Sequence, residues 1–525
     1  MMNTKGGDLV LSILRPEYVP FPENLISSLA WRIARGAFPG WESYEGKPVA
    51  LIYKKSPLAK KAPKVHFVET RPDATSEVLD GWVEALVASG FRLGDDVSHS
   101  AKSISDALLG LNIEQSSRQP ATPLTPYIAL LQNGQGVMGK AGPVNVGLIL
   151  EQLFALGNPN LITTSDEALG VKDSVAASWY VAMRSKLYDD YFLSLMDRSV
   201  RAMILNHPLN KNNDNGGEIL PDIDDLAKLL QPRIEDADDI STIYLGANTP
   251  FAWFCDTWKT LTSERWVDAL PARRWVDWAT TVLRMAFGFS YIWEANWYLA
   301  IASAVTSGEE NHEEKCLYSV HEEGQDPTIV DLDFILNSPR LKNGVAMHWK
   351  DTQNNLSFRD VTPALRITLS RGLRIRNILA DFRKKNPDLS VEETMYSLRT
   401  DARAREELIE AQREKYREQT KTVWEAVKYT LTERDSSGNK DFYGFMKTIS
   451  RKYTVIDPGT EWLAVVSSLA IDNPGGTGKL GTVLNELERL GLRPSVSEMT
   501  RYLESAGLAH SAADADTAVL IESAF

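Results

Sequence analysis

Seven of the fourteen tryptophans of this chain fall within residues 249–305, and this stretch constrains the fold more than any other. They are Trp253, Trp258, Trp266, Trp275, Trp278, Trp293 and Trp297. A large aromatic side chain buries roughly 150–250 Å², so we expect the stretch to form the centre of a large helical core. Spacings of three and four residues put Trp275 beside Trp278, and Trp293 beside Trp297, on one helical face. Pro271 is placed for the first turn of a helix that runs towards Ala304.

The composition is that of a folded protein with several structural units. The chain has 525 residues, of which 43% are hydrophobic and 24% are charged. A length prior of about 100–200 residues per domain gives roughly three units. The net charge of −13 argues against a surface that binds nucleic acid or anionic lipid everywhere. Two cysteines, Cys255 and Cys316, cannot form a disulfide framework, which is typical of the cytoplasm.

The sequence offers no segment that is suited to a membrane. The apolar run at residues 9–14 ends at Arg15 and is too short for a signal peptide. Asp277, Arg284 and Glu294 interrupt the tryptophan-rich stretch, so no window supplies the ~20 apolar residues of a spanning helix. We expect a cytoplasmic protein without membrane contact.

Composition and periodicity divide the chain into six parts. We expect a mixed α/β domain at 1–125, a helical segment with a glycine-rich turn at 126–209, an acidic surface excursion or linker at 210–242, a tryptophan-rich helical core at 243–345, a charged helical region at 346–474 and a winged-helix-like module at 475–525. The predicted fold class is mainly α with a smaller α/β part, arranged as a multidomain helical body with the C-terminal module attached.

Local capping signals refine the C-terminal half. Ser390 and Glu393 form a capping box, which predicts a helix that continues to about Thr432. In the last 50 residues, two amphipathic helices should end at Gly491 and Gly507, with a capping box at Ser495 to begin the second, and a β-prone run follows. We interpret the glycine-rich residues 475–478 as a flexible join, which would let the module fold semi-independently.

One glycine pattern resembles a phosphate-binding loop. Gly134, Gly136 and Gly139 satisfy G-x-G-x-x-G after a β-prone run. Residues 140–143 then delay the helix that should follow at once, and Asn133-Gly134 is a strong turn signal. We favour a structural turn and keep phosphate binding as the alternative.

No metal or cofactor motif is complete. His312, Cys316 and His321 lie within ten residues, but a fourth zinc ligand at the usual spacing is missing. Residues 473–480 contain the Gly-Lys centre of a P-loop and fail at both ends of that motif. The sequence therefore predicts no metal site and no cofactor.

Two groups of basic residues are candidates for contact with a DNA or RNA backbone. The first is a lysine-rich loop and the second belongs to a predicted helix: Lys54, Lys55, Lys60, Lys61 and Lys64, with Arg374 and Arg376. Clustered cations could neutralise phosphates, although solvated charge is the interpretation that we favour. From residue 476 to the end, four Lys/Arg face seven Asp/Glu, which suits contact with protein better than with DNA.

The C-terminal segment carries a resemblance to a known group of proteins. Gly507-Leu508, followed by residues 514–521, resembles the ends of uncharacterised accessory proteins in bacterial antiviral defence gene clusters. The resemblance implies a non-enzymatic scaffold or adaptor in a multi-protein assembly, with protein partners encoded nearby. The alternative is a nucleotide-dependent or nuclease-like enzyme with a non-standard site.

Overall fold

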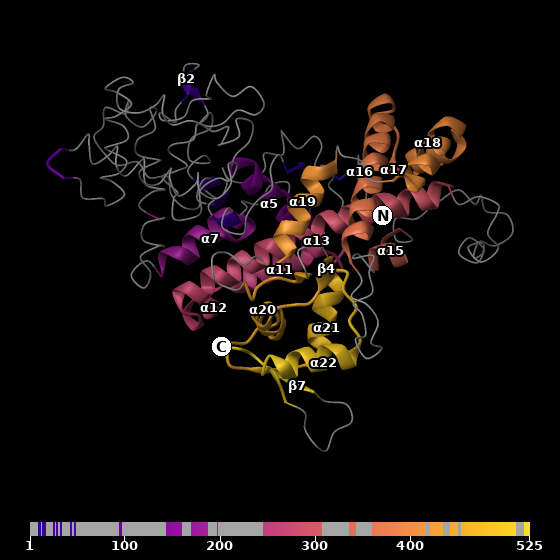
Figure 1. The fold of residues 1–525 in the computed structure, drawn as a ribbon. Helices are drawn as coiled ribbons and strands as arrows, with labels where there is room; N and C mark the ends of the chain where they lie inside the picture. The colour runs from indigo at the N-terminus through magenta and orange to yellow at the C-terminus, as the bar shows by residue number, and fades with distance from the viewer. Residues whose placement is uncertain are drawn as a thin grey trace.

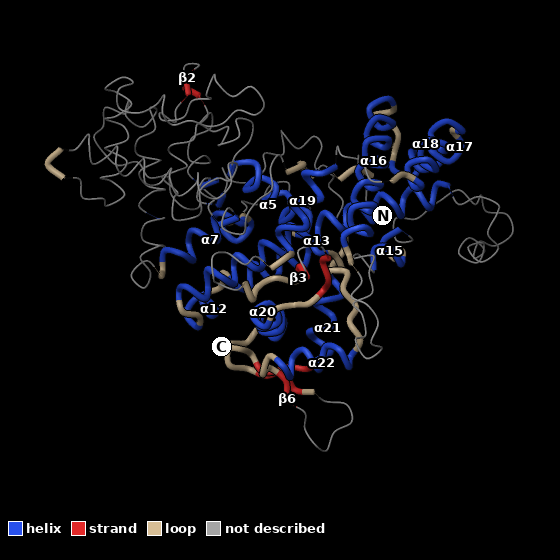
Figure 2. Tube along the Cα trace, viewed as in Figure 1, coloured by secondary structure: helices blue, strands red, loops and turns tan. Residues whose placement is uncertain are grey.

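A computed structural model describes the core of the molecule and most of its C-terminal half. The described residues are 9–11, 13–16, 25–26, 28–29, 32–33, 43–44, 47–48, 94–96, 143–159, 170–186, 197, 245–306, 335–342, 360–415, 420–433, 441–449, 453–510 and 519–525. Helices dominate them (Figure 2), which confirms the predicted mainly α class.

The helices and strands follow one another in the order used in Figure 1. They are β1 (Ser43–Tyr44), β2 (Lys47–Pro48), α5 (Pro143–Gly157), the 3-10 helix η2 (Val171–Asp173), α7 (Val175–Arg184), α11 (Pro250–Leu261), α12 (Glu264–Ala269), α13 (Ala272–Thr306), α15 (Pro339–Lys342), α16 (Thr362–Lys385), α17 (Val391–Thr400), α18 (Ala402–Arg413), α19 (Lys421–Leu431), β3 (Met446–Ile449), β4 (Tyr453–Ile456), α20 (Thr460–Ile471), β5 (Thr477–Lys479), α21 (Leu480–Arg489), α22 (Val496–Ser505), β6 (Ala509–His510) and β7 (Leu520–Glu522).

Helix α13 is the axis around which the other helices pack. Its 35 residues span about 52 Å at 1.5 Å per residue. Every residue from Thr281 to Ala302 is buried, so this part of the helix has no solvent face, as expected for a helix in the core of a large protein. Helices α5, α11, α16, α18, α19 and α20 all contact it, and Figure 1 shows it crossing the molecule between them.

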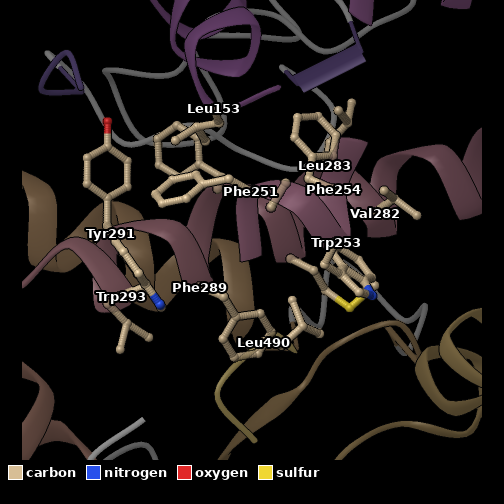
Figure 3. Close-up of a cluster of buried hydrophobic side chains, with 14 of the residues drawn as sticks. Leu153, Phe251, Trp253, Phe254, Val282, Leu283, Phe289, Tyr291, Trp293 and Leu490 are labelled. Carbon is tan, nitrogen blue, oxygen red and sulfur yellow. The ribbon is translucent and has the colours of Figure 1, made fainter. Parts of the chain in front are cut away.

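Side chains from several helices fill the core beside α13. Figure 3 shows Leu153 of α5 and Phe251 of α11 beside Trp293, which belongs to α13. The rings of Phe251 and Trp293 meet edge to face at 5.2 Å, and Trp293 stacks on Trp297 at 5.6 Å. All seven tryptophans of the block are buried. The predicted tryptophan-rich core and the helix after Pro271 are therefore confirmed.

The strands are short and lie mainly in the C-terminal third. Strands β3 and β4 form an antiparallel hairpin in which Met446 faces Ile456. Strands β5, β7 and β6 form a three-stranded antiparallel sheet in that order. The last part of the chain therefore runs helix, strand, helix, helix, strand, strand, from α20 to β7.

The single helix expected from Ser390 to about Thr432 is wrong. The capping box at Ser390 is present, but α17 ends at Asp401, which also caps the next helix. The Asp401 carboxylate accepts hydrogen bonds from the backbone N–H groups of Arg403 and Ala404 at 2.9 and 3.1 Å. A side chain that caps a new helix competes with continuation of the old one.

The flexible join expected at residues 475–478 is also wrong. Gly475 has a φ of 67°, which glycine adopts without strain, and makes a turn after α20. The N–H of Gly476 donates to the Asn473 carbonyl at 2.9 Å, and the Gly476 carbonyl accepts from Ser523 at 2.9 Å. Pairing with β7 then orders Thr477 onwards as β5, so the glycines serve a tight turn into a sheet.

The C-terminal helices share the core of the body. Val483, Leu487 and Ile521 belong to the same buried cluster as the side chains of α13. Phe525 meets Trp278 edge to face at 5.7 Å. Deletion of residues 476–525 would uncover this core. Point substitutions on the outer face of the C-terminal helices are therefore the better test of their role.

Several predictions concern residues outside the described ranges. These are most of the mixed N-terminal domain, the acidic stretch at 210–242 and the histidines and cysteine at 312–321. Among the residues that the structure does describe, no helix has the length and apolar character needed to cross a membrane.

The stacked pair in α13 predicts a large loss of stability for Trp293→Ala. Removing the indole leaves a cavity between Phe251 and Trp297, so the free energy of unfolding should fall by roughly 3–5 kcal/mol. Chemical denaturation measures this value. The matched control is Tyr396→Ala, because Tyr396 is 48% exposed. An unchanged unfolding midpoint for Trp293→Ala would contradict the structural role of the indole.

The crossing of α13 and α16 predicts opposite effects for two Gly→Ala changes. A Cβ at Gly372 would lie 2.5 Å from Ala295 Cα and 2.8 Å from its carbonyl oxygen. Gly372→Ala should therefore cost about 1–3 kcal/mol through overpacking. At Gly481 in α21 an added Cβ meets no atom within 4 Å, so Gly481→Ala should stabilise by roughly 0.5–1 kcal/mol. Thermal melts of the two variants should shift in opposite directions.

Candidate functional site

The outer face of helix α22 is the first candidate for contact with another molecule. The turn before it is closed by Gly491, with a φ of 76°, and by the N–H of Leu492, which donates to the Leu487 carbonyl at 2.9 Å. A capping box then begins α22 at Ser495, as predicted. Met499 and Leu503 are buried beneath the helix. Val496, which is 60% exposed, points away from that core.

Arg489 joins α21 to the helical body and lies at a surface pocket. Its guanidinium donates to the Ala247 carbonyl at 3.0 Å and to Asp256 at 2.5 Å. It also pairs with Glu486 at 2.9 Å. The pocket has a volume of about 420 Å³ and is lined by Ala247, Asn248, Asp256, Asn485, Glu486, Glu488 and Arg489. Burial raises the pKa of Glu486, and Arg489 acts in the opposite direction.

Charged side chains that pair with one another line this pocket between α11 and α21. Both Asp256 and Glu486 have Arg489 as an ion-pair partner, and Glu488 pairs with Arg493. The Arg489–Asp256 pair holds α21 against α11, and the lining offers no pair of groups arranged as a nucleophile and its base. The geometry of the pocket therefore supports attachment of the C-terminal unit to the helical body.

A second candidate site is a polar network buried between α13 and α16. Glu294 is almost fully buried, and its carboxylate lies 3.7 Å from Arg376 and 3.3 Å from the Tyr298 hydroxyl. Burial raises the pKa of Glu294 to about 7, although Arg376, Tyr298 and Arg15 favour the charged form. The carboxyl group therefore changes charge near neutral pH, which is unusual for a glutamate.

This network binds the backbone of residues 9–16. The Tyr298 hydroxyl accepts from the Leu11 N–H at 2.9 Å and lies 3.1 Å from the Leu11 carbonyl. Arg376 donates to the Ile13 carbonyl at 2.7 Å, and Tyr291 donates to the carbonyl of Leu14. The segment has neither helix nor strand, so side chains of the body satisfy backbone groups that a sheet would otherwise pair.

Two further buried charges also bind backbone groups. Arg284 donates to the carbonyls of Thr430 and Thr432 at 2.8 and 3.0 Å, where α19 ends. Glu151 accepts from the N–H groups of Val175 and Ala176 at 3.0 and 2.9 Å, where α7 begins. Each charge has the sign that the nearby helix end favours. Arg284 and Glu294 were visible in the sequence as charges that interrupt an apolar stretch, which is the signal for such roles.

The structure places the two predicted arginines of α16 in contacts within the protein. Arg374 pairs with Glu410 at 3.4 Å and Glu414 at 3.3 Å, and Arg376 belongs to the buried network. The two residues lie on different contacts and form no common cationic patch. Lys54, Lys55, Lys60, Lys61 and Lys64, and Gly134, Gly136 and Gly139, lie outside the described residues. Phosphate contact through them stays a prediction.

Metal chemistry finds no support in the described part of the chain, where no group of three or more His, Cys, Asp or Glu could hold an ion. Cys255 is buried, and burial raises the pKa of its thiol to about 11, so it is a poor nucleophile at neutral pH. A scan against family models and searches of curated proteins and of solved structures each found no match.

The raised pKa of Glu294 predicts a specific pH dependence of stability. Between the ordinary pKa of about 4.3 and the folded value of about 7, the folded state binds the proton more tightly than the unfolded state. The free energy of unfolding should therefore fall as the pH rises through this window. Glu294→Gln should flatten that slope, measured by denaturation between pH 5 and pH 8. The surface variant Glu407→Gln serves as the control, and an unchanged slope in Glu294→Gln would contradict the assignment.

Proposed function

We propose that this protein is a non-enzymatic scaffold or adaptor of a multi-protein bacterial assembly, and that its C-terminal unit is a winged-helix module that binds a protein partner. The observation that carries the proposal is the exposed outer face of α22 on a unit that is fixed to a large helical core. A fixed unit presents one surface in one orientation, which is the task of a scaffold.

The order of elements supports a winged-helix module. A helix, a strand, two helices and a two-stranded hairpin follow one another from α20 to β7, and the third strand pairs between the other two. This order is the one expected for a winged-helix fold and supports the proposal; in helix-turn-helix proteins the second helix of the pair faces the ligand. Here that helix is α22. We place the start of the module at α20, earlier than the boundary at residue 475, because α20 packs on both α21 and α22.

Charge favours a protein partner over DNA. Residues 476–525 carry seven Asp/Glu and four Lys/Arg. A duplex would meet an excess of negative charge there, whereas DNA-binding helices need cations for phosphate contact. Arg489 and Arg493, two of the four cations, are engaged in ion pairs with Glu486 and Glu488 of the same region. We therefore infer a partner whose surface is basic around an apolar centre that covers Val496.

The resemblance of the C-terminal segment to accessory proteins of antiviral defence clusters gives the proposal its setting. In such an assembly, the partners are products of adjacent genes in the cytoplasm. The scaffold then holds in place a partner that carries out the activity of the assembly. Nucleic-acid contact through the lysine-rich loop at 54–64 would be electrostatic and would weaken steeply with added salt.

The test compares two Val→Asp variants of the full chain. Val496 on α22 and Val181 on α7 are 60% and 40% exposed, so a carboxylate at either position should leave the fold intact. Tagged wild type and both variants are co-expressed with the products of the adjacent genes and purified. Val496→Asp should lose its partner, because it places a charge in the apolar centre of the interface, and Val181→Asp should retain it.

Two results would contradict the proposal. If Val496→Asp keeps the same melting temperature and retains every partner, α22 is not the docking face. If the isolated wild-type chain releases phosphate from a nucleotide or cuts DNA, the enzyme hypothesis replaces the scaffold. The melting temperature of each variant, measured on the purified sample, separates loss of binding from loss of folding.

A further inference from the structure

The body of the protein binds residues 9–16 in the way that a receptor binds a peptide. Three side chains are inserted almost completely, because Leu9, Leu11 and Ile13 are each at most 1% exposed. They occupy alternate positions, and Arg15, the next in this series, donates to Asn377 at 2.7 Å. The contacts come from helices α5, α13 and α16, which are distant from the segment in sequence.

Recognition of the segment rests on its main chain. Trp297 donates to the Leu9 carbonyl at 3.0 Å, and the Leu14 N–H donates to Gln152 at 3.0 Å. Together with the bonds from Tyr298, Arg376 and Tyr291, every described residue from 9 to 14 except Val10 has a backbone group bonded by a side chain of the body. Main-chain bonds supply affinity for any peptide of the right shape, and pockets for alternate side chains supply specificity.

We propose that this groove of α5, α13 and α16 is a peptide-binding site in which residues 9–16 are the resident ligand, exchangeable for a segment of a partner protein. The partner segment has aliphatic residues at its first, third and fifth positions and an arginine at its seventh. The arginine is positioned by Asn377, whose side-chain oxygen accepts a hydrogen bond from Arg15 at 2.7 Å, while Glu294 attracts the Arg15 charge and Arg376 opposes it. The inference rests on the scaffold role and adds a second site at which a partner is held.

The test uses the full chain and a labelled peptide. The probe is a fluorescent synthetic peptide with the sequence of residues 9–16. In the double variant Leu11→Asp/Ile13→Asp, carboxylates replace the inserted side chains, so the resident segment should leave the groove. The peptide should bind the double variant tightly and wild type only weakly, because in wild type it must displace the resident segment. A peptide that carries the same two aspartates is the matched control and should not bind.

Adding Tyr298→Phe to the double variant removes the hydroxyl that bonds Leu11. Because the lost hydrogen bond to the Leu11 N–H contributes about 1 kcal/mol, peptide affinity should fall about fivefold. Tyr443→Phe removes a hydroxyl elsewhere in the molecule and should leave the affinity unchanged. A folded double variant that does not bind the peptide, or that binds it equally well after Tyr298→Phe, would overturn the proposal.

Hydrogen exchange on wild type provides a measurement that does not depend on the double variant. If the groove exchanges its occupant, the amides of Leu11 and Leu14 should exchange by local opening, faster than the amides of α13. If they exchange only with global unfolding, the segment is a permanent part of the core and the proposal fails. Peptide binding is measured on the purified chain without any partner, so its failure is distinguishable from failure of the α22 interface.

Discussion

The burial of α13 from Thr281 to Ala302, where the helix has no solvent face, is the constraint on which the rest of the structure depends. A helix without a solvent face must be covered on every side, and the cover here comes from helices that precede and follow it in the chain. Its apolar surface stabilises the fold only when all of these helices are in place, because hydrophobic stabilisation is proportional to the area removed from water. This requirement explains why segments from residue 9 to residue 525 meet in one cluster.

Burial on this scale creates a second requirement, which is to satisfy backbone groups where helices end or where the chain is irregular. Three charged side chains meet it. Arg284 bonds the carbonyls at the end of α19, Glu151 bonds the N–H groups at the start of α7, and Glu294 supports Arg376 beneath the N-terminal segment. An unpaired backbone group in the same place would cost more than the bond itself contributes. The burial of Arg284, Glu151 and Glu294 is therefore explained by the architecture around them.

The C-terminal unit, from α20 to β7, also contributes one face to the common core, but its other face stays exposed. Its inner face belongs to the common core through Leu487, Ile521 and Phe525, and Arg489 fixes it to the loop before α11. The outer face of α22 is left open. The groove for residues 9–16 lies between α13 and α16, so the two candidate sites are built on different elements of one rigid core. A scaffold gains from such an arrangement because it can hold two partners at a fixed separation.

The sequence by itself determined the features that depend on local spacing. The tryptophan periodicity predicted α13, Ser390 and Ser495 predicted helix starts, and Gly491 and Gly507 predicted helix ends, because each signal acts within a few residues. Interactions between residues far apart in the sequence were decided only by the tertiary structure. Asp401 ends the helix that was expected to continue to about Thr432, pairing with β7 converts a glycine-rich stretch into a strand, and Glu294 meets Arg376 across two helices. Those outcomes depend on partners far away in sequence, and no local pattern encodes which residues the packing of α13 brings together.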